Sequence, residues 1–136
     1  MTFLKTALIA GTAAASVATI PAAQAQRYWV PRGWHVIGTT TVNGRRDTDD
    51  IYTPGRQNFR AIRLCAYRAP IHLRDVSIRF KNGARQDARV RDYLRANTCT
   101  RAIDLRGRTR DIARVRMKYD RLYSHTRPVV QVAALR

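Results

Sequence analysis

Short segments in which apolar and polar residues alternate with a period of two dominate the chain from residue 34 onward. In the clearest of them Val76, Ile78 and Phe80 alternate with polar neighbours, and an Asn-Gly pair follows at residues 82–83. Successive side chains of a β-strand point to opposite faces of its sheet, and Asn-Gly favours a tight turn, so this pattern predicts a strand with one buried face. By the same criterion we predict strands within residues 34–42, 51–53, 59–67, 73–80, 100–105, 111–119 and 128–135.

The most charged stretch, residues 104–119, raises the alternative of an arginine-rich arm that grips phosphates. Its second half alternates between apolar and cationic residues in the order Ala113, Arg114, Val115, Arg116, Met117, Lys118 and Tyr119. A helix would scatter both sets around its axis, and a disordered arm would not carry the apolar series. We therefore predict a strand whose apolar side chains point inward and whose cations point to solvent.

Residues 84–98 are ambiguous between helix and strand. Asp87 is suited to cap a short helix that buries Val90, Tyr93 and Leu94, but the same segment could pair back across the preceding Asn-Gly turn as a strand. We favour a strand followed by a turn or a single helical turn.

About eight short strands, punctuated by Gly, Pro and Asn-Gly, with hardly any helix, predict an all-β fold. The expected architecture is a small antiparallel β-sandwich or jelly roll, with a closed barrel as the alternative.

The N-terminal segment is typical of a secretory signal peptide, since a short basic start precedes the apolar run at residues 6–20 and small residues lead to a cleavage point after Ala25. We expect residues 1–25 to be the signal peptide, 26–33 a lead-in segment, and 34–136 a single domain. The mature chain has no second apolar run long enough to cross a bilayer, so the sequence predicts a protein exported to the periplasm or secreted.

The two cysteines, Cys65 and Cys99, are predicted to form a disulfide because an isolated pair in an oxidising compartment is usually bridged. Two buried free thiols are the alternative.

The formal net charge is +17, and arginine outnumbers lysine by 23 to 3, while all nine acids are aspartate. A potential of this size attracts polyanions, whatever the origin of the arginines. Acidic polysaccharides and lipid head groups are the expected partners. Nucleic acid is disfavoured, because few aromatic residues are interleaved with the cations.

Segments distributed along the chain resemble those of the YaaI-type exported bacterial proteins, a domain-of-unknown-function family. The similar positions are Ile37-Gly38, Phe59 to Leu64, Asp75 to Gly83, Ile103 to Gly107 and Arg110 to Tyr119. The resemblance implies an exported β-sandwich of unknown role. It transfers no catalytic residue, and the cysteines are not part of it.

Residues 43–50 are predicted to be a polar loop that begins at an Asn-Gly pair. Its aspartates, Asp47, Asp49 and Asp50, could bind Ca²⁺ through their oxygens, but the neighbouring arginines compete for them, and Asx-turn hydrogen bonding is the favoured reason for their presence. We expect no metal and no cofactor.

The three histidines, His35, His72 and His125, suggest an alternative function. A small basic exported protein could cleave RNA if two histidines served as general acid and general base beside a cation. No nucleophile elbow, phosphate-binding loop or zinc motif accompanies them, so no catalytic residue is assigned.

The favoured hypothesis is a non-enzymatic envelope protein that binds anionic ligands or lipid head groups through a basic sheet face. By alternation, the outward cations of that face are Arg63, Arg79, Arg114, Arg116 and Lys118. If their strands are neighbours, these cations form one patch, to which Tyr67 could add a flat surface for a ligand ring. A secreted hydrolase acting on a polyanion remains the alternative.

Overall fold

The structure is a computed structural model that describes residues 30–107, 110–121 and 125–136. The expected signal peptide and residues 26–29 of the lead-in lie outside the described residues. The described part of the chain contains no helix, hence none that could span a membrane. Its strands are β1 (Trp34–Thr41), β2 (Arg46–Tyr52), β3 (Asn58–Phe59), β4 (Ala61–Tyr67), β5 (Ile71–Phe80), β6 (Arg85–Ala88), β7 (Asp92–Leu94), β8 (Thr98–Cys99), β9 (Ile103–Asp104), β10 (Arg110–Arg121) and β11 (Val129–Leu135).

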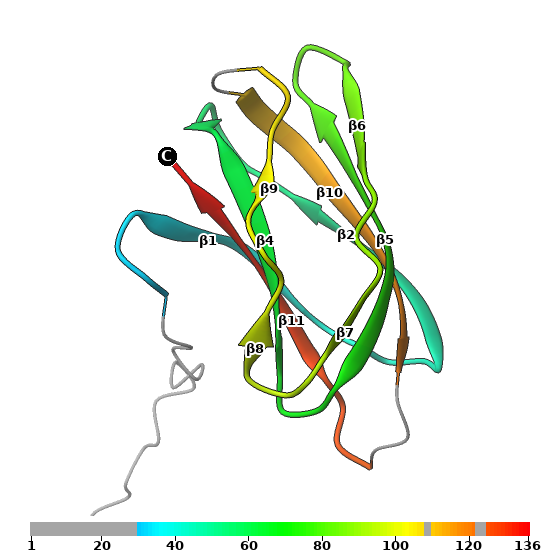
Figure 1. Ribbon diagram of the computed structural model, residues 1–136. Coiled ribbons are helices and arrows are strands. Elements are labelled where there is room, and N and C mark those ends of the chain that lie inside the picture. The colour runs from blue at the N-terminus through cyan, green and yellow to red at the C-terminus, as the bar shows by residue number, and fades with distance from the viewer. Residues whose placement is uncertain (1–29, 108–109, 122–124) are drawn as a thin grey trace, which may run out of the picture.

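Two antiparallel sheets face each other (Figure 1). Sheet A has the order β1-β11-β4-β8, with β9 also paired to β4, and sheet B has the order β2-β10-β5-β6, with β7 paired to β5 and β3 to β10. Strands from the two halves of the chain pair with each other: β1 with β11, β2 with β10, β4 with β8 and β9, and β5 with β6 and β7. Taken in this order, successive pairs lie in alternate sheets. This arrangement is a jelly roll, which confirms the predicted all-β sandwich, and the closed barrel is wrong.

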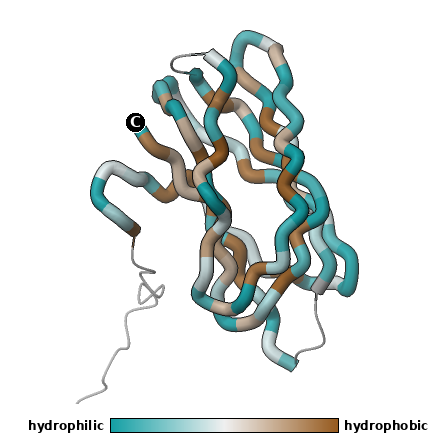
Figure 2. Tube along the Cα trace, in the orientation of Figure 1, coloured by the Kyte–Doolittle hydropathy of each residue, from teal (hydrophilic) through white to brown (hydrophobic). Residues whose placement is uncertain are grey.

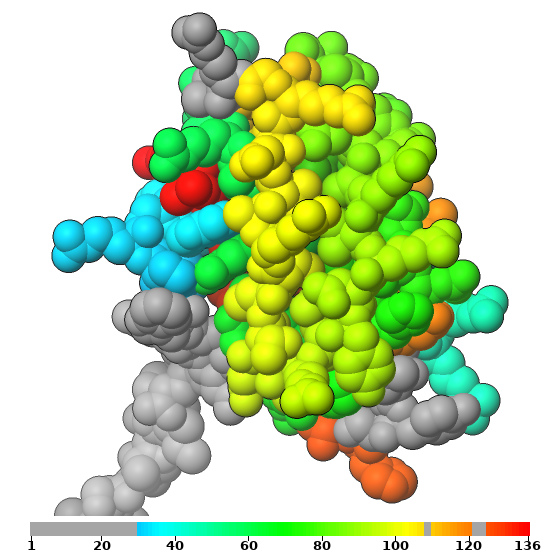
Figure 3. Space-filling model, in the orientation of Figure 1, coloured from blue at the N-terminus to red at the C-terminus, as the bar shows by residue number. Residues whose placement is uncertain are grey.

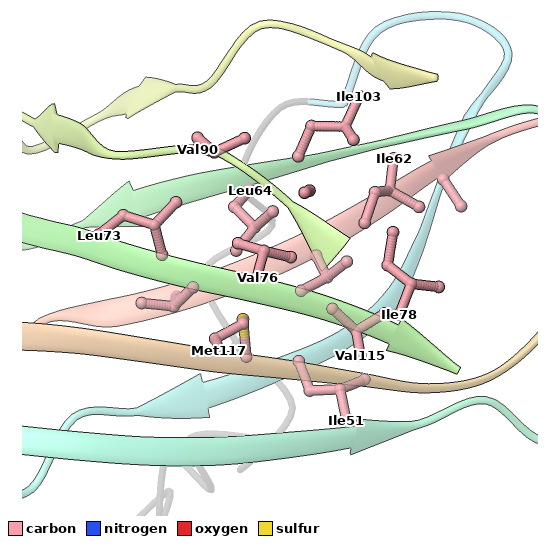
Figure 4. Close-up of a cluster of buried hydrophobic side chains, with 14 of the residues drawn as sticks. Ile51, Ile62, Leu64, Leu73, Val76, Ile78, Val90, Ile103, Val115 and Met117 are labelled. Carbon is pink, nitrogen blue, oxygen red and sulfur yellow. The ribbon is translucent and has the colours of Figure 1, made fainter. Parts of the chain in front are cut away.

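The core lies between the sheets, where alternate residues of each central strand meet (Figure 4). Ile62 and Leu64 of β4 face Val76 and Ile78 of β5, and all four are fully buried. Each such side chain contributes about 1.5–3 kcal/mol relative to exposure. The hydropathy colouring shows the same alternation of apolar and polar positions along β5 and β10 (Figure 2).

The segment from β6 to β9 crosses from sheet B to sheet A and covers one side of the sandwich (Figures 1 and 3). Buried Gln86 of β6 links the two sheets, because its Nε2 donates to the Asp104 carbonyl (2.8 Å) and its Oε1 accepts from the Arg106 amide (2.7 Å). This segment contains four very short strands where the pattern predicted fewer, longer ones. These short strands, together with the two-residue β3, explain why the described residues form eleven strands where the sequence predicted about eight.

The structure resolves the ambiguity of residues 84–98 in favour of the strand. Residues of β6 pair with β5 across the Asn-Gly turn, with Arg85 opposite Arg79 and Ala88 opposite Val76. A turn at Asn97, which has a φ of 64°, follows β7. The helical alternative is wrong, since the backbone groups of β6 are already paired to β5.

The predicted polar loop at residues 43–50 is wrong in its second half, where β2 begins at Arg46. This strand is polar because it lies at the edge of sheet B, and only Ile51 is buried. Its backbone pairs with β10 along the full length of the strand, which stabilises it despite its lack of apolar residues.

Alternation along β10 also departs from the prediction at one point. A register shift between Ile112 and Arg114 leaves Ala113 half-buried at a bulge, whereas Ile112, Val115, Met117 and Tyr119 all point into the core. The bulge adds one residue to β10, so strict alternation fails there. From Arg114 to Tyr119 the prediction is confirmed.

The predicted disulfide is confirmed. Cys65 of β4 and Cys99 of β8 lie directly opposite each other in neighbouring strands, with their Cα atoms 3.9 Å apart. The bond fastens the edge strand β8 to the centre of sheet A.

Candidate functional site

The outer face of sheet B collects most of the cations predicted for a basic surface. Cross-strand pairing aligns them in rows: Tyr52, Arg114 and Arg79; Asp50, Arg116 and Ser77; Thr48, Lys118 and Asp75. Because residues opposite each other on neighbouring strands share a face, Arg79, Arg114, Arg116 and Lys118 form one surface, as alternation predicted.

Arg63 and Tyr67 do not belong to this surface, because they lie on β4 in sheet A. Arg63 is half-buried, and its guanidinium stacks on the Trp34 ring, 4.8 Å from the ring centre. Tyr67 is only 7% exposed, packed beside Cys65 and Val129. The expectations of one patch that includes Arg63 and of a flat exposed surface at Tyr67 are therefore wrong.

Two of the cations on the outer face are neutralised within the sheet. Asp50 accepts hydrogen bonds from Arg116 at Nε (2.8 Å) and Nη2 (2.9 Å), and these bonds hold the pKa of the carboxyl below its ordinary value. Likewise, Arg85 pairs with Asp87 at 3.0 Å and donates to the hydroxyl of Ser77. These pairs leave the middle row of the face electrically balanced.

Beside this balanced row lies a groove of about 1070 Å³. It is lined by His72, Arg74, Asp75, Arg89, Arg91 and Lys118. Four of these side chains are arginine or lysine cations, against one carboxylate. Arg89, Arg91 and Lys118 are exposed and form no ion pair with any described residue. The groove therefore offers three positive charges that nothing in the described chain satisfies.

The local backbone explains how arginines reach this groove. Val90, in the connection between β6 and β7, points into the core, so its neighbours Arg89 and Arg91 both point outward. On β5 a register shift opposite Lys118 and Tyr119 makes Arg74 the extra residue, which places it next to Asp75 on the outer side. Sequence alternation alone identified only Lys118 of this set as a ligand-binding candidate.

Asp120 of β10 organises one end of the groove. Its carboxylate lies 3.6 Å from Arg74 Nε, 3.6 Å from Arg46 Nε, and 3.8 Å from His72 Nδ1. Arg74 is thereby held in place, and its charge is partly offset.

Two tyrosines stand exposed on the same face. Tyr93 of β7 lies opposite His72 and is 57% exposed, so an aromatic ring borders the groove. Tyr52, 66% exposed, lies opposite Arg114 on the edge strand β2, at the far edge of the same face. The alternation pattern did not single out either one as a surface residue.

The three aspartates of β2 do not converge on one point. Asp50 points outward with Arg116, whereas Asp49 points inward, where Tyr119 donates its hydroxyl proton to Asp49 Oδ2. Burial, followed by the charge of Asp47, raises the pKa of Asp49. Asp47 accepts hydrogen bonds from the amides of Asn43 and Thr48 (both 3.0 Å), the turn chemistry favoured from the sequence. Across the described ranges, no group of three or more His, Cys, Asp or Glu residues could hold a metal ion.

The three histidines are not paired either. His35 lies on β1 of sheet A, His72 on β5 of sheet B, and His125 between β10 and β11. No described hydrogen bond or ion pair joins two of them, and His72 instead contacts Asp120.

Comparisons with known proteins give a family but no function. Neither the curated proteins nor the solved structures contain a match to this chain. One family model, described as "Domain of unknown function (DUF2541)", matches residues 7–134. The chain therefore belongs to the DUF2541 family.

Proposed function

We propose that this protein is an exported, non-enzymatic binding module that holds an anionic component of the cell envelope in the groove on the outer face of sheet B. The observation that carries the proposal is a set of exposed cations, Arg89, Arg91 and Lys118, which have no ion-pair partner among the described residues and line one groove with Arg74.

Export is supported by the signal-peptide pattern of residues 1–25 and by the disulfide between Cys65 and Cys99, since structural disulfides persist in oxidising compartments. The resemblance to the YaaI-type exported proteins points the same way. Periplasm and extracellular space both fit these observations.

Charge distribution supports binding over simple solubility. A surface that is basic only for solubility needs no particular arrangement of its cations. Here the aspartates Asp50 and Asp87 neutralise Arg116 and Arg85, whereas three of the four groove cations, Arg89, Arg91 and Lys118, have no ion-pair partner among the described residues. An anionic ligand would supply the missing counter-charges through charge-assisted hydrogen bonds.

The proposed hydrolase alternative has weaker support. Acid–base cleavage of a polyanion needs two titratable groups on one bound phosphate. His72 is the only histidine that lines the groove among the described residues, and the carboxylate that it contacts is Asp120, which belongs to the ion-pair cluster with Arg46 and Arg74.

The test measures retention of the purified, disulfide-intact protein on immobilised heparin, lipopolysaccharide and peptidoglycan at rising NaCl. We compare the wild type with R89Q/R91Q/K118Q. A matched control, R45Q/R56Q/R101Q, removes the same charge at three exposed arginines outside the groove.

The groove variant should bind the preferred polymer about tenfold more weakly than the control variant, since three charge-assisted contacts are lost. Equal losses in both variants would mean that only net charge matters, and the proposal would fail. Absence of binding by the wild type at low salt would also refute it.

A further inference from the structure

The groove contains one group that a simple anion site would avoid. Asp75 lines it beside Arg74 and opposite Lys118. Its carboxylate is half-buried and forms no hydrogen bond or ion pair with the described residues. A carboxylate repels an anionic ligand, and it accepts hydrogen bonds only. The ligand that fits therefore also carries hydroxyl or N–H donors close to its negative groups.

A second feature adjoins the groove. Tyr93 presents an exposed ring next to His72, which lines the groove. An exposed aromatic ring provides an apolar face on which a planar base or the C–H face of a sugar can pack. A bare phosphate or polyphosphate has no surface that could use it.

On the basis of the proposed function, the geometry points to an acidic saccharide as the ligand: a sugar chain bearing carboxylate, phosphate or sulfate groups, with its anionic groups on Arg89, Arg91 and Lys118, its hydroxyls on Asp75 and a sugar ring on Tyr93. Each part of this ligand meets a group of matching chemistry in or beside the groove.

Single-stranded nucleic acid combines anions, hydroxyls and rings as well, but it fits less well. Proteins that bind it without sequence preference stack successive bases on several aromatic side chains. Only Tyr93 borders the groove among the described exposed aromatic residues, since Tyr52 lies on the edge strand β2 beside Arg114. A single aromatic ring can pack against one sugar ring, but it cannot stack a series of bases.

The test titrates four probes into the protein: an oligogalacturonate, a heparin-derived oligosaccharide, inorganic polyphosphate and oligouridylate. The first variant is D75N, and its control is D104N, which removes the same charge from an exposed position on β9 of sheet A. The second variant is Y93A, and its control is Y52A.

An amide oxygen still accepts a hydrogen bond, but a weaker one than a carboxylate does, so we expect D75N to bind at least one of the two acidic oligosaccharides several-fold more weakly. It should bind polyphosphate more tightly, because the repulsion is gone, while D104N changes neither in this way. Y93A should weaken binding of the same oligosaccharide several-fold and leave polyphosphate unchanged, and Y52A should do neither.

Two results would overturn the inference. If D75N strengthens binding of all four probes, Asp75 only repels anions. If Y93A weakens oligouridylate more than both oligosaccharides, the groove binds nucleic acid. In either case a selective loss in R89Q/R91Q/K118Q would still uphold the groove as an anion site, so the two proposals fail separately.

Discussion

Asp50 on the edge strand β2 and Arg116 on the central strand β10 face each other across the outer surface of sheet B, joined by two hydrogen bonds of 2.8 and 2.9 Å. This two-pronged contact ties a strand with a single buried residue, Ile51, to its neighbour. It also supplies Arg116 with a counter-charge inside the sheet, so this guanidinium does not need an anionic ligand to balance it.

Replacing Asp50 by asparagine should destabilise the fold near neutral pH. Its pKa is lowered from 3.8, chiefly by the hydrogen bonds from Arg116, so the ionised carboxylate stabilises the folded state above pH 3.8. That contribution is lost as pH falls through the lowered value. Thermal melting should show D50N about 2 to 4 °C below wild type at pH 7, with the gap closing at strongly acidic pH. A gap that is independent of pH would contradict the assignment.

Replacing Asp49 by asparagine should have the opposite effect on thermal stability near neutral pH. Burial and the charge of Asp47 raise its pKa above 3.8, so the folded protein binds this proton more tightly than the unfolded chain does. Its contribution to stability therefore falls as pH rises from 3.8 through the raised value. D49N keeps an oxygen that can accept the Tyr119 hydroxyl, and it should melt above wild type at pH 7 but not below pH 3.8. D104N, which makes the same change in net charge, should not melt above wild type at pH 7.

The disulfide should be a large single contribution to stability. Cys65 and Cys99 are 34 residues apart, and closing a loop of this size stabilises the folded state by roughly 3 to 4 kcal/mol in the chain-entropy model. Urea denaturation of C65A/C99A should show a loss of this order. Reduction of the wild type should produce a similar shift, and a shift below about 1 kcal/mol would show that the unfolded chain gains little freedom.

Gly38 should not tolerate a side chain. A Cβ there would overlap Cγ2 of Ile51 and lie 3.1 Å from its Cδ1, because β1 and β2 approach each other closely at this point. G38A should destabilise the protein by about 1 to 3 kcal/mol. I51L removes the offending methyl while conserving volume, so G38A/I51L should lose less than the sum of the single variants in a double-mutant cycle. Strict additivity would place the strain elsewhere.

The alternation of apolar and polar residues correctly predicted the regular strands that bury one face and expose the other. In β5 the inward set Val76, Ile78 and Phe80 is buried, as predicted. The pattern failed where burial does not follow alternation. Tyr67, expected to offer a flat surface to a ligand, and Cys65, which shares its face of β4 by alternation, are buried because both faces of that strand are covered. Of the polar strand β2, only the end at residues 51–52 was predicted as strand, because residues 46–50 include no apolar side chain.

The candidate site was only partly predictable, for two physical reasons. Alternation assigns a side chain to a face of its own strand but not to a sheet, so Arg63 and Arg79 looked equivalent although they lie on different sheets. The groove itself depends on irregular backbone. Arg74 enters it at a register shift, and Arg89 and Arg91 enter it from a connection between two short strands. Neither feature has a periodic signature.

The order of strands has a consequence for synthesis. The strand between β1 and β4 is β11, the last of the described strands, and the strand between β2 and β5 is β10. A nascent chain that ends before residue 110 therefore lacks an inner strand of each sheet, so neither sheet can be completed until residues 110–135 have been synthesised. Both sheets therefore depend on pairing between strands that are distant in sequence, and such non-local pairing makes folding slow.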